Sequence, residues 1–107
     1  MKYTPTAVTG VQLVELELRE DDRGFFARTF DVTEFAAHGL DTAVAQGNLS
    51  FNHAAGTLRG LHRQVPPYAE GKLVRCTRGA IVDVAVDVRP GSPTFGEHVL
   101  VELTADN

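Results

Sequence analysis

Tryptophan is absent from this chain, cysteine and methionine each occur once, and the aromatic residues are only six Phe and two Tyr. A single cysteine, Cys76, cannot form an intrachain disulfide, which predicts a reducing compartment. Cys76 lies in an apolar run, so we expect a small buried side chain there and not a nucleophile. The sequence therefore favours neither a disulfide-stabilised fold nor cysteine chemistry.

Long apolar runs are also missing. The segment MKYTPTAVTG has no hydrophobic core of the signal-peptide type, and no run approaches the roughly 20 residues that span a bilayer. Neither of the glycine-rich phosphate-binding motifs, GxGxxG or GxxxxGKT, occurs. With a net charge of −4 and a pI of about 5.4, a nucleic acid or a membrane surface is not the expected partner. These absences predict a soluble, cytoplasmic protein.

The strand-like runs predict an all-β fold. The chain has 107 residues, of which 43% are hydrophobic, and no linker divides it, so a single domain is expected. About seven runs alternate with turn residues: 11–19, 25–30, 43–51, 57–63, 72–77, 80–88 and 95–103. This pattern is typical of a jelly roll or small barrel, here one strand short of eight, so we expect an exposed edge. Residues 1–10 are expected to be an irregular lead-in.

One short helix is expected near residues 31–38. Asp31 is a favourable N-cap residue, and Glu34 follows at the spacing of a capping box. Gly39 provides the left-handed conformation that ends many helices. At about two turns the helix is too short to be stable alone, so we expect packing to hold it.

The basic residues are concentrated between positions 59 and 78. This stretch has five basic residues and one acidic residue, in a chain of net charge −4. They are Arg59, Arg63, Lys72, Arg75 and Arg78, with Glu70. A cationic strip in an acidic protein predicts a small anionic ligand.

Ionisable side chains among apolar strand residues are the candidate functional groups. They are Arg59, His62, Lys72 and Asp83, which are costly to place there unless they are paired or used. A lone histidine in a strand is more often structural than catalytic. The charged residues near His62 in the sequence favour a functional role for it. Gly60 permits a bulge that would turn Arg59 and His62 toward one cavity; otherwise Arg59 faces solvent.

The run 80–88 has a polar and an apolar face. The apolar face carries the valines at 82, 84, 86 and 88 and is expected to meet the core. The face that carries the two aspartates, Asp83 and Asp87, points the other way. Asp87 is interpreted as a surface residue. Asp83, in mid-strand, is placed to hold Lys72 or His62 by a charge-assisted hydrogen bond.

A metal site is not expected. The histidines are too far apart in sequence for a two-histidine strand motif, and no Glu completes one. They are His38, His53, His62 and His98.

Several motifs together resemble the dTDP-4-dehydrorhamnose 3,5-epimerase family. They are RGFF at 23–26, GTLRGLHRQ at 56–64, KLVRCTRG at 72–79, DVAVDVR at 83–89 and GSPTFG at 91–96. The resemblance implies a cupin-like jelly roll that works as a homodimer, with residues 1–107 forming the N-terminal and central part of one domain. It also implies an epimerase that acts on a dTDP-4-keto-6-deoxyhexose in dTDP-rhamnose synthesis, without a cofactor or metal.

The resemblance implies three catalytic residues. His62 matches the base that removes the protons beside the keto group, a role that suits an imidazole near neutral pH. Lys72 matches the cation that stabilises the resulting enolate, and Asp83 matches its supporting carboxylate.

The resemblance also implies the substrate contacts. Arg59 matches a diphosphate and sugar contact, for which a guanidinium fork is suited. Gln46 and Asn48 match pocket-lining positions. Arg23 and Phe26 match residues that hold the nucleotide, in this family often across the dimer.

Two departures from the family leave alternatives open. Arg28 stands where many members have a glutamate near the nucleotide base, so the nucleotide preference is open. The strands that carry the tyrosine acid and the histidine-orienting aspartate lie beyond Asn107 in the family, and neither Tyr3 nor Tyr68 matches that tyrosine. The alternatives are a truncated, non-catalytic module that binds a sugar nucleotide, or a 3,4-ketoisomerase. Epimerisation at C3 alone or at both C3 and C5 also stays open.

Overall fold

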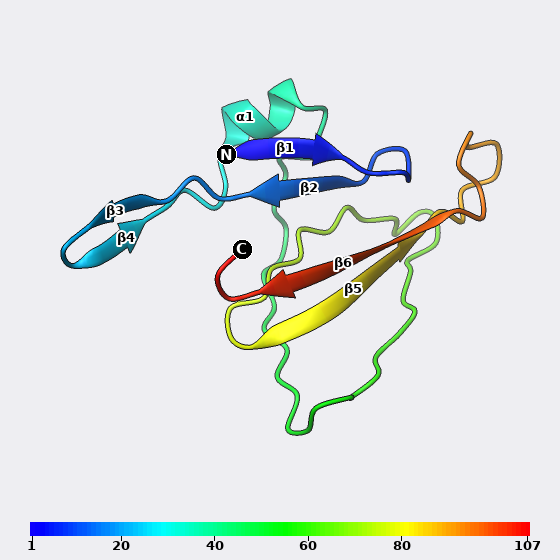
Figure 1. The fold of residues 1–107 in the computed structure, drawn as a ribbon. Helices are drawn as coiled ribbons and strands as arrows, with labels where there is room; N and C mark the ends of the chain where they lie inside the picture. The colour runs from blue at the N-terminus through cyan, green and yellow to red at the C-terminus, as the bar shows by residue number, and fades with distance from the viewer.

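The computed structural model describes residues 1–107 and consists of six strands and one helix (Figure 1). The strands form three separate two-stranded antiparallel sheets, β1–β2, β3–β4 and β5–β6. Their bounds are β1 Lys2–Pro5, β2 Gln12–Glu15, β3 Arg19–Asp21, β4 Gly24–Phe26, α1 Val32–Ala37, β5 Ala80–Val86 and β6 His98–Thr104. The predicted predominance of strands with one short helix is confirmed. A closed barrel is not formed, and no helix is long and apolar enough to cross a membrane.

The first hairpin corrects the expected lead-in. β1 pairs with β2 in a register that places Tyr3 opposite Val14. Across the same hairpin the Lys2 ammonium lies 3.0 Å from the Glu15 carboxylate. Residues 2–5 are therefore a strand and not irregular as expected, with the Lys2–Glu15 and Tyr3–Val14 pairs suited to an antiparallel ladder, whereas residues 6–10 lead through a turn to β2.

The second hairpin, β3–β4, lies where the predicted runs 11–19 and 25–30 meet, and it corrects both: the first run is interrupted between β2 and β3, and the second forms a strand only at its start, in β4. The Asp21 carboxylate accepts hydrogen bonds from the backbone and the guanidinium of Arg23. Gly24 has a φ of 128°, which other residues rarely adopt. The hairpin projects from the rest of the chain, and all its residues are exposed (Figure 1).

Helix α1 forms as predicted at both ends. The Asp31 carboxylate accepts hydrogen bonds from the backbone N–H groups of Thr33 and Glu34, and Gly39 follows the C-cap with a φ of 69°. The reciprocal half of the capping box is missing, because the Glu34 carboxylate accepts from the Met1 amino group at 3.2 Å. Packing holds the helix, as expected: Phe35 is 3% exposed.

The long segment between α1 and β5 corrects the strand predictions. Residues 43–51, 57–63 and 72–77 form no strand, and no helix lies between residues 38 and 79. A strand requires a partner for its backbone N–H and C=O groups, and none of the three hairpins pairs with this segment. The predicted bulge at Gly60 is absent for the same reason, although Gly60 has a φ of 103°. We call residues 41–79 the open segment.

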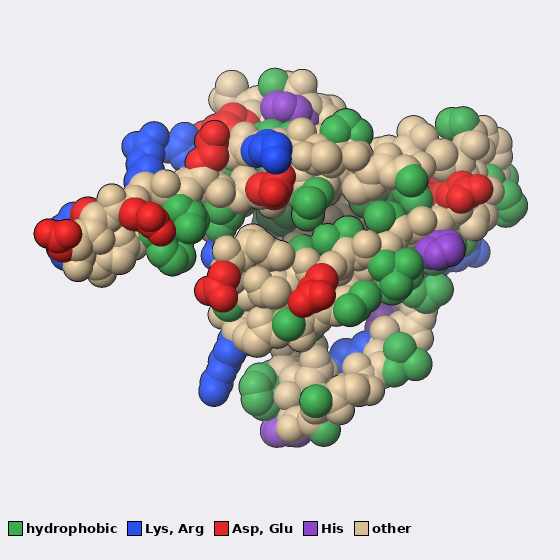
Figure 2. Space-filling view, viewed as in Figure 1, with side chains coloured by type: hydrophobic (Ala, Val, Ile, Leu, Met, Phe, Trp, Pro, Cys, Tyr) green, Lys and Arg blue, Asp and Glu red, His purple; other side chains and the backbone are tan.

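The third hairpin, β5–β6, is the longest; its strands form within the predicted run 80–88 and, three residues later than predicted, in place of the run 95–103. Its register runs from Ala80 opposite Thr104 to Val86 opposite His98. The expectation that the valine face meets the core is wrong, because Val82 is 62% exposed and Leu100, on the same face, 59%. A two-stranded sheet beside one other hairpin has only one face covered. Hydrophobic side chains accordingly lie open on the surface around β5 and β6 (Figure 2).

The buried core is small. Four residues are buried: Val8, Phe35, Cys76 and Asp87. Cys76 is buried as predicted, with its thiol 3.4 Å from the carbonyl oxygens of Arg78 and Gly79. A largely apolar cavity of about 240 Å³ separates the side chains of β2, β6 and residues 73–76. The two longer hairpins are therefore incompletely packed against each other.

Candidate functional site

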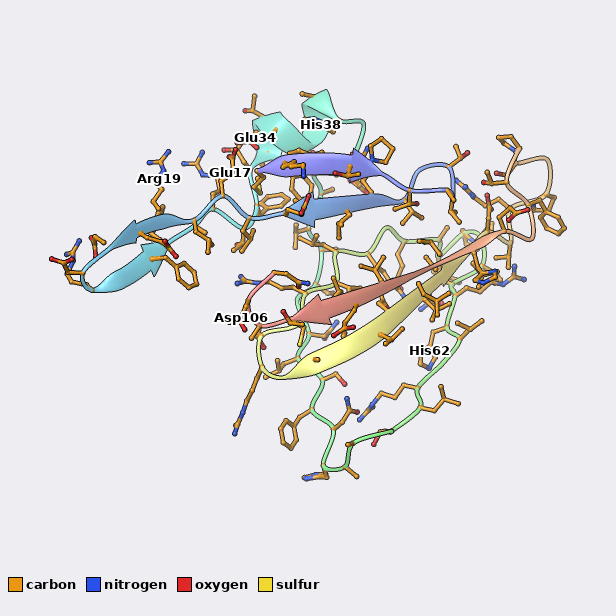
Figure 3. The ribbon with its side chains drawn as sticks, in the orientation of Figure 1. Glu17, Arg19, Glu34, His38, His62 and Asp106 are labelled. Carbon is orange, nitrogen blue, oxygen red and sulfur yellow. The ribbon has the colours of Figure 1, made fainter.

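His62 is an exposed side chain on the open segment (Figure 3). Its ring makes no hydrogen bond. A Cβ atom added at Gly60 would lie 3.3 Å from His62 Nδ1, so glycine at position 60 leaves room for the ring. The imidazole is therefore free to meet a ligand from solvent.

Lys72 and Arg59 both bind neighbours within the open segment. The Lys72 ammonium lies 3.2 Å from the Glu70 carboxylate, and both side chains are about half exposed. Arg59 donates from Nε to the Asn52 side chain at 2.6 Å and from Nη2 to the Phe51 carbonyl at 3.1 Å. Exposed contacts of this kind contribute little to stability, so a stronger anionic ligand would displace them easily.

Asp83 lies in the middle of β5, opposite Val101, and is half-buried. Its carboxylate makes no hydrogen bond or ion pair. The expected hydrogen bond from Lys72 or His62 is absent, because the open segment does not pair with β5. The three predicted catalytic residues are therefore joined by no hydrogen bond or ion pair in this structure.

The predicted substrate contacts lie in two separate places. Gln46 and Asn48 are exposed on the open segment, without hydrogen bonds from their side chains. Arg23 and Phe26 lie on the β3–β4 hairpin. The Arg23 guanidinium is held by Asp21, an ion pair that raises the pKa of the arginine, while Phe26 is 68% exposed.

A shallow notch lies at the base of the β3–β4 hairpin. It is about 80 Å³ in volume and is lined by Met1, Glu17, Arg19, Phe26, Arg28 and Glu34. Arg28 donates to the Asp31 carboxylate at 2.9 Å. The hydrogen bond that the Asp31 carboxylate accepts from the backbone N–H of Glu34 is the main cause of its lowered pKa. Arg28 is thus bound to the helix N-cap at this notch.

The other side of the notch is an ion-pair group around the α-amino group of Met1. Glu17 accepts from it at 2.7 Å, and Glu34 accepts at 3.2 Å (Figure 3). The hydrogen bond to Glu17 is the main cause that raises the pKa of the amino group, and it lowers the pKa of Glu17 in return. The two carboxylates are therefore compensated within the chain.

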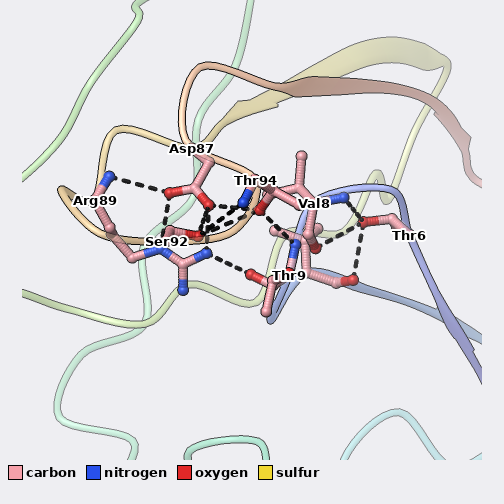
Figure 4. Close-up of polar contacts among 8 residues, drawn as sticks. Thr6, Val8, Thr9, Asp87, Arg89, Ser92 and Thr94 are labelled. Carbon is pink, nitrogen blue, oxygen red and sulfur yellow. Dashed lines mark hydrogen bonds and ion pairs between the residues drawn. The ribbon is translucent and has the colours of Figure 1, made fainter.

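The most extensive polar group was missed by the sequence interpretation. Asp87, expected at the surface, is only 2% exposed. Its carboxylate accepts hydrogen bonds from the Arg89 guanidinium, the Ser92 hydroxyl and the Thr94 hydroxyl (Figure 4). Together with Thr9, which contacts Arg89 and Thr94, we call these residues the Asp87 cluster. The signal for it was the short spacing of the aspartate, the arginine and two hydroxyl residues around a Pro-Gly turn.

The electrostatics of the Asp87 cluster are those of a compensated buried charge. The hydrogen bond from Arg89 is the largest cause that holds the pKa of Asp87 far below its usual range, and Ser92 and Thr94 add to it. The same pair raises the pKa of Arg89. Every acceptor of this carboxylate is already in use within the chain, so the cluster is a structural feature and not a ligand site.

No group of three or more His, Cys, Asp or Glu side chains lies close enough to hold a metal ion.

Comparison with known proteins identifies one family. Residues 5–107 match the family model described as dTDP-4-dehydrorhamnose 3,5-epimerase. The chain is 45% identical over 107 residues to a dTDP-4-dehydrorhamnose 3,5-epimerase of Sinorhizobium fredii, covering 100% of this chain and 55% of that protein. It is 47% identical over 108 residues to the enzyme of that name from Pseudomonas aeruginosa, covering 100% and 59%. The chain thus spans little more than half the length of these relatives.

Solved structures agree with the sequence matches. The structure of dTDP-4-dehydrorhamnose 3,5-epimerase from Elizabethkingia anophelis superposes with a TM-score of 0.94 at 39% identity, covering 100% of this chain and 58% of that one. The Bacillus anthracis enzyme, solved with TDP and PPi bound, gives a TM-score of 0.93 at 42% identity, covering 99% and 61%. The three hairpins and the open segment therefore follow the backbone path of these proteins.

Proposed function

Because the chain belongs to the dTDP-4-dehydrorhamnose 3,5-epimerase family, we propose that it forms part of an isomerase that epimerises a dTDP-linked 4-keto-6-deoxy sugar for dTDP-rhamnose synthesis. The observation that carries the proposal is the family match over residues 5–107. Because the chain spans 55% of a curated relative, the proposal concerns the full-length protein. In it, residues 1–107 form the N-terminal and central part of one cupin-like jelly-roll domain.

The proposed chemistry begins with proton removal by His62. A proton beside a ketone is acidic enough for an imidazole base, provided that the ring reaches it directly. The ring makes no hydrogen bond within the chain, which leaves a nitrogen available. The resulting negative charge develops on the keto oxygen, where the Lys72 ammonium stabilises it most strongly in the transition state.

Lys72 and Asp83 each have capacity left for a further polar contact. Lys72 is held only by Glu70, in an exposed pair of low stability. Asp83 has no polar partner and is half-buried, so a cation or hydrogen-bond donor brought near it gains a charge-assisted contact. In the proposal, the keto oxygen of the sugar takes the place of Glu70 beside the Lys72 ammonium, and Asp83 supports Lys72.

The nucleotide and diphosphate contacts complete the proposed site. Arg59 has its Nη1 donors free for diphosphate oxygens, and Gln46 and Asn48 offer amide groups from the same segment. Arg23 and Phe26, on the projecting hairpin, are proposed to hold the nucleotide from a second subunit of a cytoplasmic homodimer. The TDP and PPi bound to the Bacillus anthracis relative support a nucleoside diphosphate as the ligand class.

A second candidate function is a binding module without turnover. The observation that favours it is that no hydrogen bond or ion pair joins His62, Lys72 and Asp83. Titration calorimetry with dTDP and with the sugar nucleotide separates the candidates when it is combined with an activity assay. Binding without hydrogen exchange supports the module, and the absence of both excludes the two candidates together.

The experiment that tests the epimerase proposal is solvent deuterium incorporation. The full-length protein is incubated in D₂O with dTDP-4-keto-6-deoxyglucose, and the label at C3 and C5 is followed by NMR. Deuterium at either carbon with an epimerised product supports the proposal. Product analysis in the same sample distinguishes C3 from C3 and C5 epimerisation, and from a 3,4-ketoisomerase product. A well-folded protein that binds the substrate but exchanges no hydrogen would contradict it.

A further inference from the structure

The contact between the β1–β2 and β5–β6 hairpins depends on a single polar junction. Only two hydrogen bonds join residues 1–40 to residues 80–107, and both involve the backbone of Thr9. The Thr9 N–H donates to the Thr94 hydroxyl at 3.1 Å, and the Arg89 guanidinium donates to the Thr9 carbonyl. No ion pair joins these two parts of the chain. The junction therefore carries all the directional contact between the hairpins.

Asp87 orients both groups that reach Thr9. Its Oδ2 atom accepts from Arg89 Nη2 at 2.7 Å and from the Thr94 hydroxyl at 2.7 Å. Because the Thr94 proton points at Asp87, the hydroxyl lone pairs are left to accept the Thr9 N–H. The backbone of Asp87 also accepts from Gly96 and donates to Glu97, which closes the loop that carries Arg89 and Thr94. Asp87 thus determines the direction of each contact to the opposite hairpin.

The β1–β2 turn, on the other side of the junction, packs closely against the loop that carries Arg89. Two of the four buried residues of the chain, Val8 and Asp87, lie at this junction, each 2% exposed. A Cβ atom added at Gly10 would lie 3.4 Å from Arg89 Nη1, and Gly10 has a φ of 84°. The Thr6 hydroxyl shares its one proton between the carbonyls of Val8 and Val11, accepts from the Val8 N–H, and so fixes the turn from within (Figure 4). The β1–β2 turn is therefore held by its own hydrogen bonds where it meets the Asp87 cluster.

We propose that Asp87 is a positioning residue that fastens the β1–β2 turn to the loop between β5 and β6 and so sets the spacing of the two hairpins across the 240 Å³ cavity. The cavity is largely apolar, and apolar contacts around it are non-directional, so they define this spacing weakly. A charge-assisted, multiply bonded junction at one end supplies the missing constraint. This inference goes beyond the proposed function and holds whatever reaction the full-length protein catalyses.

The test is residue-resolved amide hydrogen exchange by NMR in the full-length protein. In Asp87→Asn, the added NH₂ group faces the Arg89, Ser92 and Thr94 donors, so the Thr9 contacts are expected to break. The Thr9 amide should then exchange about tenfold faster, beyond any change in the β1–β2 and β5–β6 ladder amides. The control is Glu97→Gln, a carboxylate of the same loop that makes no side-chain hydrogen bond, which should leave the Thr9 rate unchanged.

A second pair of variants keeps the test decisive if Asp87→Asn does not fold. Thr94→Val removes the acceptor of the Thr9 N–H with little change of shape, and Thr94→Ser retains it. Faster Thr9 exchange in the valine variant, restored to the original rate in the serine variant, supports the proposal. A Thr9 amide that accelerates no more than the ladder amides, in either Asp87→Asn or Thr94→Val, overturns it, because Asp87 would then contribute only general stability.

Discussion

The Asp87 cluster and the open segment differ in how far their polar side chains are hydrogen-bonded within the chain. In the cluster, a buried carboxylate is fully used by three side chains. On the open segment, His62 makes no hydrogen bond, and Lys72 is held only by an exposed neighbour. A group that is satisfied inside the chain stabilises the fold, whereas a group that is left free is available to a ligand. The difference separates the residues expected to affect stability from those expected to affect activity.

The largest expected effect is on the open segment, at His62. His62→Ala in the full-length protein should lower the rate of solvent deuterium incorporation by roughly 10²–10⁴-fold, because a general base contributes about that factor. The melting temperature should not change, since the ring makes no hydrogen bond. The matched control is His53→Ala, another exposed histidine of the same segment, which should retain the exchange rate. Full exchange by the His62 variant would remove this residue from the proposed mechanism.

The second effect concerns Lys72. Lys72→Met should lower the exchange rate by roughly 10²–10³-fold, because the enolate loses its fixed positive charge. NMR of deuterium incorporation measures the exchange rate, and a thermal melt of the same sample measures the melting temperature, which should change little. A large fall in the melting temperature together with the loss of activity would show that Lys72 stabilises the fold and does not act on the substrate.

The third effect is on stability and compares two aspartates of the same strand region. Asp87→Asn should lower the melting temperature by roughly 5–10 °C, because the Arg89, Ser92 and Thr94 donors lose a shared acceptor. Asp83→Asn should change it by less than about 3 °C, because no side chain donates to that carboxylate. Calorimetry of both variants checks the comparison, and an equal loss would contradict the structural role given to Asp87.

The fourth effect is the response to acid. Because the folded pKa of Asp87 is held far below its usual value by Arg89, then Ser92 and Thr94, ionised Asp87 stabilises the fold above about pH 4. This stabilisation should fall progressively as the pH falls from about 4 toward the folded pKa. Urea unfolding between pH 6 and pH 2 should show a steeper loss in the original protein than in Asp87→Asn. Parallel curves would show that Asp87 does not cause the acid sensitivity.

The smallest effect is expected for the exposed ion pair on the open segment. Glu70→Gln should change the melting temperature by less than about 2 °C, because an exposed pair is worth little. It should leave hydrogen exchange into the substrate within about twofold, since the proposed role of Lys72 does not use Glu70. A large loss of activity would place Glu70 in the substrate site.

The sequence predicted those elements whose signals are local. Asp31 and Gly39 mark the two ends of α1, and the alternation of residues 80–88 predicted β5, because caps and strand patterns depend on near neighbours. The strands expected within the open segment require partners far along the chain, and no local pattern reports whether a partner is present. The same limit explains the valine face of β5, whose burial depends on what lies opposite.

The candidate site was predictable only as a set of residue types. The motifs around His62, Lys72 and Asp83 indicated the family, and the comparisons confirm it. Asp87 was missed because its partners, Arg89, Ser92 and Thr94, follow a turn whose geometry alternation does not describe. A carboxylate followed within seven residues by an arginine and two hydroxyl residues is the signal that would have found it.

Binding of a nucleoside diphosphate shows directly whether the free polar groups of the open segment form the ligand site. In a titration of the ¹⁵N-labelled full-length protein with dTDP, we expect chemical-shift changes at the amides of the open segment, including Arg59, His62 and Lys72, and at Arg23 and Phe26. The amides of Asp87, Ser92 and Thr94 should stay in place. Shifts confined to the Asp87 cluster, or a saturating titration that leaves the open segment unperturbed, would contradict this expectation.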